Sequence, residues 1–169
     1  MFDHLYDAFG AWRDLNEGCF LFVDFSEAYD SVTHQFASTF FPSLSFPPQL
    51  VTLLQNLFKS PKALDINGGV CLSSLIWPTS GIRQGCPLSP ILFAMLVSPT
   101  IHKLNSVSPS IRVLLYADDL LVIIRDTLSE CPAHLTKINS VLQEFEFIVG
   151  LSVNKEKNAL LLKGKWLEL

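Results

Sequence analysis

Short apolar segments along the chain predict buried β-strands. Residues 19–25 (CFLFVDF) are apolar at nearly every position and too short for a helix, so they predict a central strand covered on both faces. Residues 111–116 and 120–124 are two further apolar segments, separated by the sequence Ala-Asp-Asp at 117–119. This arrangement predicts a β-hairpin with an acidic tip.

Apolar residues at helical spacing predict four helices between and after these strands. Ser89 is the expected N-cap of the third helix, and Gly150 is the expected C-cap of the fourth. The predicted helices cover residues 29–40, 47–59, 90–104 and 135–149.

Two more strand pairs complete the predicted order. Asn67-Gly68 lies between apolar residues, which predicts a hairpin around residues 66–70. A last pair of strands is expected at residues 151–153 and 159–162. The order βααββαββαββ predicts the α+β class, with a ferredoxin-like split-βαβ antiparallel sheet and helices packed on one face.

Composition limits the function classes. The 169 residues are one domain in length, and 49% hydrophobic against 17% charged residues excludes a disordered tail. The net charge of −4 argues against a self-sufficient basic nucleic-acid binder. No apolar stretch approaches the roughly 18 residues of a membrane span, and the cysteine spacing indicates neither a zinc site nor a disulfide framework. We therefore expect an intracellular protein with no membrane contact.

Acidic residues mark the ends of two predicted strands. Asp24 ends the first strand, and Asp118 and Asp119 lie at the tip of the later hairpin. Alone, Asp24 could cap the next helix and the Asp pair could form a solvated turn. If the sheet brings the three carboxylates together, they need a cation between them, and oxygen ligands favour Mg²⁺ or Mn²⁺. Two such ions suit in-line phosphoryl transfer.

Four segments, in order, resemble motifs A to D of a reverse transcriptase palm. They are residues 22–32 (FVDFSEAYDSV), 80–90 (SGIRQGCPLSP), 116–119 (YADD) and 150–157 (GLSVNKEK). The sequences of these motifs are most similar to those of non-LTR, LINE-type retrotransposon enzymes, and the resemblance covers about residues 19–162. Asn158, which follows motif D, stands where relatives often have Thr or Ser.

The resemblance implies a role for each motif residue. Asp24 and Asp118 would bind two Mg²⁺ or Mn²⁺ ions, with Asp119 assisting and the Phe25 carbonyl as a further ligand. Tyr29 would be the steric gate that favours dNTPs, and Lys157 would be the general acid for the leaving pyrophosphate. The implied substrate-binding residues are Phe25, Ala28, Tyr29, Arg83, Gln84 and Gly85. If the motif resemblance is set aside, the alternative interpretation of Tyr29 is a core residue of its helix. The alternative interpretation of Arg83 and Lys157 is a pair of solvated surface cations.

The resemblance implies an RNA-directed DNA polymerase that extends a primer 3′-hydroxyl with dNTPs on an RNA template. Residues 1–169 would be a partial reverse transcriptase domain that carries the palm and largely lacks fingers and thumb. An inactive palm remnant or interaction module from a truncated retroelement is the alternative. A ferredoxin-like RNA-binding module is disfavoured because no basic, aromatic sheet face is visible.

Overall fold

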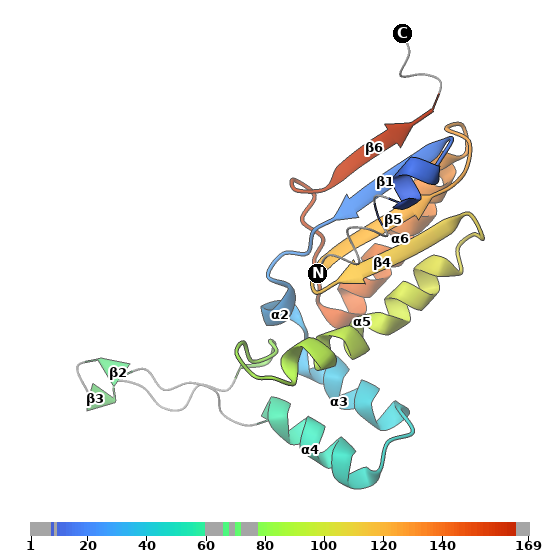
Figure 1. Ribbon diagram of the computed structural model, residues 1–169. Helices are drawn as coiled ribbons and strands as arrows, with labels where there is room; N and C mark the ends of the chain where they lie inside the picture. Colours follow the sequence, from blue (N-terminus) through green and yellow to red (C-terminus); the bar gives the residue numbers. More distant parts are fainter. Residues whose placement is uncertain (1–7, 9, 60–65, 68–69, 72–77, 165–169) are drawn as a thin grey trace.

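A four-stranded antiparallel sheet forms the centre of the computed structural model, which describes residues 8, 10–59, 66–67, 70–71 and 78–164 (Figure 1). The strands lie in the order β4-β5-β1-β6. Their bounds are β1 Gly18–Val23, β4 Ile111–Tyr116, β5 Asp119–Ile124 and β6 Ala159–Lys163. The α+β class expected from the sequence is confirmed.

Helices occupy the segments between the strands. Their bounds are α2 Ala28–Ser31, α3 His34–Ser43, α4 Pro48–Lys59, α5 Ser89–Asn105 and α6 Cys131–Val149. A two-residue pair, β2 Ile66–Asn67 and β3 Val70–Cys71, confirms the predicted hairpin, although its turn residues and the rest of its second arm lie outside the described residues. Within the part of the chain that the structure describes, no helix is long and apolar enough to cross a bilayer.

Strand β5 is covered on both faces. In β5, alternate residues Leu120, Val122 and Ile124 pack into the large core with buried residues of α5 and α6. Leu121 and Ile123 point to the other face, where they join a smaller cluster with Ala11, Leu15 and Phe20. Burial on both faces explains why β5 is a continuous apolar segment rather than an alternating one. The expected central position of β1, between β5 and β6, is confirmed.

The predicted helix over residues 29–40 is in fact two helices, and that prediction was wrong. The break falls at Val32, whose ψ of 119° leaves the helical region. Thr33 then caps α3, because its side-chain oxygen accepts the Phe36 N–H at 3.4 Å. The Thr33 N–H donates to the Val149 carbonyl at 2.9 Å, and Thr33 also forms a β-bridge with Ser80. These tertiary bonds override a local periodicity that one helix would satisfy.

Two smaller expectations were also wrong. Ser89 is the first residue of α5 rather than its N-cap, and its hydroxyl donates to the Arg83 carbonyl of the preceding loop. Residues 151–153 form no strand, since only Val153 makes an isolated bridge, to Phe25, and β6 pairs with β1 instead. The predicted C-cap of α6 is confirmed: Gly150 has a φ of 91°, in the left-handed region that glycine tolerates.

Candidate active site

Strand pairing brings the two acidic segments to one end of the sheet. Asp24 directly follows β1, whose last residue Val23 pairs with Leu120 of β5. Asp119 begins β5, and Asp118 lies in the turn before it. The pKa of the Asp119 carboxyl is raised, first by burial and then by the charges of Asp118 and Asp24. The three acids are thus close enough to interact electrostatically.

An open cavity of about 410 Å³ lies between Asp24 and Asp118. Its lining comes from motif A, the motif B loop, the acidic turn and the segment before β6. The lining residues are Asp24, Phe25, Ser26, Glu27, Ala28, Tyr29, Asp30, Gln84, Asp118, Asn154 and Lys157. Seven of the ten residues singled out from the sequence therefore border one space.

The other three candidate residues lie elsewhere. Asp119 lines a neighbouring cavity of about 510 Å³, which shares Asp24 and Lys157 with the first and is otherwise mostly apolar. Arg83 and Gly85 line neither cavity, and both are exposed. Gly85 has a φ of 80°, and a Cβ built on it would meet no atom within 4 Å. The motif B loop therefore presents Gln84 alone to the cavity.

The oxygen atoms that border the cavity are of the type that hard divalent cations prefer. Asp24 and Asp118 supply carboxylate oxygens to the same cavity. The β-bridge between Phe25 and Val153 is made by two backbone hydrogen bonds, one to the Asp24 carbonyl and one from the Ser26 N–H. Neither bond uses the Phe25 carbonyl, which is therefore available as a ligand. The expected grouping of three carboxylates is looser than a metal site: among the described residues, no three Asp, Glu, His or Cys side chains are arranged to hold an ion.

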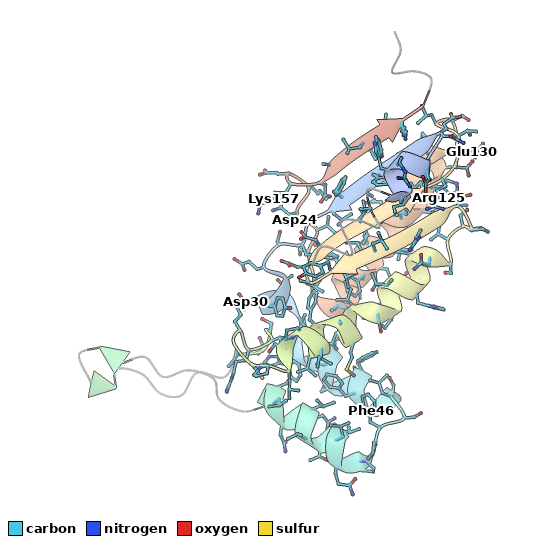
Figure 2. All side chains as sticks on the ribbon, in the orientation of Figure 1. Asp24, Asp30, Phe46, Arg125, Glu130 and Lys157 are labelled. Carbon is cyan, nitrogen blue, oxygen red and sulfur yellow. The ribbon has the colours of Figure 1, made fainter. Side chains whose placement is uncertain are left out.

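Lys157 is the cation of this site. Its Nζ lies 3.7 Å from Asp24 Oδ2, and Figure 2 shows both residues at the same end of the sheet. The Lys157 side chain is 70% exposed and the Asp24 side chain 32%. Solvent screens such a pair, so its contribution to stability is small and the ammonium is free to move.

Tyr29 forms the wall of the cavity on the side of the core. Its ring stacks on Phe93 of α5, with ring centroids 4.8 Å apart and planes 19° apart. Burial, and then the charge of Asp118, raise the pKa of the Tyr29 phenol. Phe93 is itself only 1% exposed, so the ring of Tyr29 is supported from behind by the core.

Backbone hydrogen bonds connect motif B to α2 and to the residue that follows it. The Gly81 N–H donates to the Val32 carbonyl at 2.8 Å, and the Ile82 N–H donates to the Tyr29 carbonyl at 2.6 Å. Gln84 Nε2 then donates to both carboxylate oxygens of Asp30, at 3.4 and 3.2 Å. The amide that borders the cavity is therefore oriented by an acid six residues after Asp24.

Sequence reasoning missed several residues that shape this site. Glu27 and Ala117 have φ values of 47° and 52°, and they are the non-glycine residues with positive φ in the described part of the chain. Both are adjacent to candidate residues, and such strain is typical of functional sites. His34, Asp30 and Asn158 also hold site segments by side-chain hydrogen bonds. The sequence signals for these residues were the positions of Glu27 and Asp30 in motif A and of Ala117 in motif C, and the Asn158 departure from Thr or Ser.

Comparison with curated proteins gives retrotransposon relatives. The chain is 27% identical over 161 residues to the transposon TX1 uncharacterized 149 kDa protein of Xenopus laevis, covering 86% of this chain and 11% of the relative. It is 29% identical over 141 residues to the Pol polyprotein of the R2DM element of Drosophila melanogaster, covering 80% and 13%. It is 26% identical to the RNA-directed DNA polymerase from mobile element jockey of Drosophila funebris, covering 82% and 15%. The expected similarity to LINE-type enzymes is confirmed.

Solved structures with the same fold include telomerases. The telomerase of Candida tropicalis in complex with a fragment of telomeric RNA superposes with a TM-score of 0.75 and 16% identity, covering 95% of this chain and 29% of that one. The Candida albicans telomerase gives a TM-score of 0.64 at 15% identity. The family model described as reverse transcriptase (RNA-dependent DNA polymerase) matches residues 6–167. With nearly its whole length matched, the chain belongs to the reverse transcriptase family.

Proposed function

We propose that this chain carries the catalytic palm of an RNA-directed DNA polymerase from a retrotransposon. The reaction is attack of a primer 3′-hydroxyl on the α-phosphate of a dNTP, with an RNA template and release of pyrophosphate. The observation that carries the proposal is the cavity in which Asp24, Asp118 and Lys157 meet, from three segments far apart in sequence. The family assignment gives that cavity its chemistry.

The strand order supports a palm of the ferredoxin-like, split-βαβ kind. Taken in chain order, the strands of the main sheet are β1, β4, β5 and β6, and β1 lies between the third and the fourth. Helix α5 connects the first to the second, and α6 connects the third to the fourth. That is the β-α-β-β-α-β arrangement, with the acids at the end of β1 and at the turn between β4 and β5.

Asp24 and Asp118 would hold two Mg²⁺ or Mn²⁺ ions, with Asp119 assisting and the Phe25 carbonyl as a further ligand. When bound, the ions activate the attacking hydroxyl and stabilise the charge on the leaving phosphates. The carboxylates that border the cavity supply the negative charge that such a site requires. Burial raises the pKa of Asp119, and the charges of Asp118 and Asp24 raise it further, so these acids repel one another.

The remaining site residues would bind the nucleotide. Tyr29, backed by Phe93, would lie beneath the sugar and exclude a 2′-hydroxyl, next to the buried Ala28. Gln84 would contact the incoming nucleotide and template, Gly85 would allow close backbone approach, and Arg83 would reach phosphate or template. Lys157 would protonate the leaving pyrophosphate, since its exposed ammonium already borders the cavity.

The proposed partners are an RNA template, a DNA primer and dNTPs. The chain spans only 11–15% of the length of the curated relatives described above. A net charge of −4 provides little attraction for phosphate backbones. We propose that residues 1–169 are a partial reverse transcriptase domain carrying motifs A to D, and that segments outside it grip the nucleic acid.

Primer extension by the full chain tests the function. The assay supplies a DNA primer on an RNA template, one dNTP and Mg²⁺, with saturating enzyme so that weak nucleic-acid binding does not mask turnover. Addition of one nucleotide, dependent on the metal and on Asp24, is expected. Mn²⁺ binding that depends on Asp24, with no addition, would instead identify an inactive palm remnant.

Replacing Tyr29 by alanine is expected to weaken discrimination against ribonucleotides. The substitution removes the ring that is held against Phe93, so the space beneath the sugar opens. The ratio of kcat/KM for rNTP to that for dNTP is expected to rise about 100-fold, because a lost steric clash is worth up to a few kcal/mol. Phe36→Ala, which removes an aromatic ring of α3 that does not border the cavity, is the control. An unchanged ratio for Tyr29→Ala would contradict the gate.

A further inference from the structure

The main chain of Asp24 is held on both sides by the segment before β6. The Asp24 N–H donates to the side-chain oxygen Oδ1 of Asn158 at 3.0 Å, across 134 positions in sequence. The Asp24 carbonyl accepts the Asn154 N–H at 2.8 Å. Both hydrogen-bonding groups of this one peptide residue are therefore satisfied by residues 154–158.

A side chain makes the first of these bonds because the backbone has left the sheet. The β1–β6 ladder ends at the pair Phe22 and Ala159. Before it, residues 154–157 form a tight turn, in which the Lys157 N–H donates to the Asn154 carbonyl at 3.2 Å. Beyond the end of the ladder, the Asn158 side-chain oxygen accepts the Asp24 N–H.

The residue that makes this bond is the chain neighbour of Lys157. Lys157 immediately precedes Asn158, and its Nζ is 3.7 Å from Asp24 Oδ2. The Lys157 stem is exposed and makes a screened ion pair, so the ion pair alone cannot hold the two segments together. The partly buried Asn158 bond connects them together with the bond from the Asn154 N–H to the Asp24 carbonyl.

We propose that Asn158 is a positioning residue of the active site, which fixes Asp24 and Lys157 relative to each other. This role rests on the proposed function and extends it to a residue that touches no substrate. Asn158 does not line the cavity between Asp24 and Asp118, whereas both residues that it positions do. With the Asn154 bond, the Asn158 bond would keep the end of β1 next to the turn that carries the lysine.

The test compares two identical substitutions. Asn158→Leu keeps the side-chain size and removes the acceptor for the Asp24 N–H. Asn105→Leu is the matched control, because Asn105 Oδ1 accepts the Val113 N–H of β4 at the same distance of 3.0 Å. Asn105 and Val113 line neither cavity at the site. Thermal unfolding is expected to show that both variants fold and lose similar stability.

Three readouts separate positioning from general stability. Asn158→Leu is expected to speed hydrogen exchange of the Asp24 amide about fivefold, to weaken Mn²⁺ binding measured by calorimetry about tenfold, and to lower kcat for dNTP addition about 10- to 100-fold. KM for dNTP is expected to change less than kcat, because the nucleotide contacts remain. Asn105→Leu is expected to keep all three values within about twofold of wild type.

The outcomes are distinct. Wild-type values for Asn158→Leu in exchange, metal binding and kcat would overturn the positioning role, and so would equal losses in both variants. If wild-type protein shows no Mn²⁺ binding that depends on Asp24, the proposed function fails instead. Amide exchange then decides whether Asn158 holds Asp24, since that readout needs neither metal nor substrate.

Discussion

Asp118→Ala is expected to lower single-nucleotide addition at least about 1000-fold, which corresponds to about 4 kcal/mol of transition-state stabilisation. Asp118 lies in the β4–β5 turn and shares the cavity with Asp24. Removing one of the two carboxylates proposed to hold the ions leaves too few oxygen ligands for a divalent cation. Steady-state addition and calorimetric Mn²⁺ titration measure the two losses.

The free energy of unfolding of Asp118→Ala is not expected to fall with its activity. Asp118 is exposed at a turn, and its charge helps to raise the pKa of Asp119. Its removal relieves that repulsion, so the free energy of unfolding at pH 7 is expected to be unchanged or slightly higher, within about 0.5 kcal/mol. A variant that folds as well as wild type but adds no nucleotide separates chemistry from folding.

Glu130→Ala is the control for loss of a carboxylate. Glu130 is exposed and lies at the opposite end of the sheet from Asp24 (Figure 2). It is expected to keep nucleotide addition within about twofold of wild type. An Asp118→Ala variant whose rate of nucleotide addition stays within tenfold of wild type would contradict the metal-binding role of this acid.

Gly18→Ala is expected to lower the free energy of unfolding by at least about 3 kcal/mol, from a steric clash and positive-φ strain together. Gly18 begins β1 with a φ of 140°, and a Cβ built there would lie 2.1 Å from the carbonyl oxygen of Ile124. That neighbour is backbone of β5, so it cannot rotate away as a side chain would. The strand carrying Asp24 would have to move.

Chemical denaturation of the two alanine variants Gly18→Ala and Gly10→Ala provides the measurement. Gly10 lies in the helical segment at residues 10–14, and a Cβ there meets no atom within 4 Å. Alanine in a helix is favoured over glycine by up to about 1 kcal/mol, so Gly10→Ala is expected to stabilise the protein. A loss below 1 kcal/mol in Gly18→Ala would show that β1 and β5 separate easily at that end.

The sequence alone predicted the elements whose cause is local. The apolar segments of β1, β4 and β5, the periodic α6 with its Gly150 cap, and the hairpin at β2 and β3 all depend on residues a few positions apart. The four motifs predicted the family in the same way, since each is a short contiguous segment. The acids at the ends of β1 and of the hairpin also follow from the sequence, because strand ends are local boundaries.

The tertiary structure decided everything that depends on pairing between distant segments. Bonds from Thr33 to Ser80 and Val149 split one periodic segment into α2 and α3. The β1–β5 register placed Asp118 in one cavity with Asp24 and turned Asp119 to the next. Asn158 reached Asp24 across 134 positions. Periodicity and motifs describe what a segment prefers by itself, and these contacts arise only when the sheet has assembled.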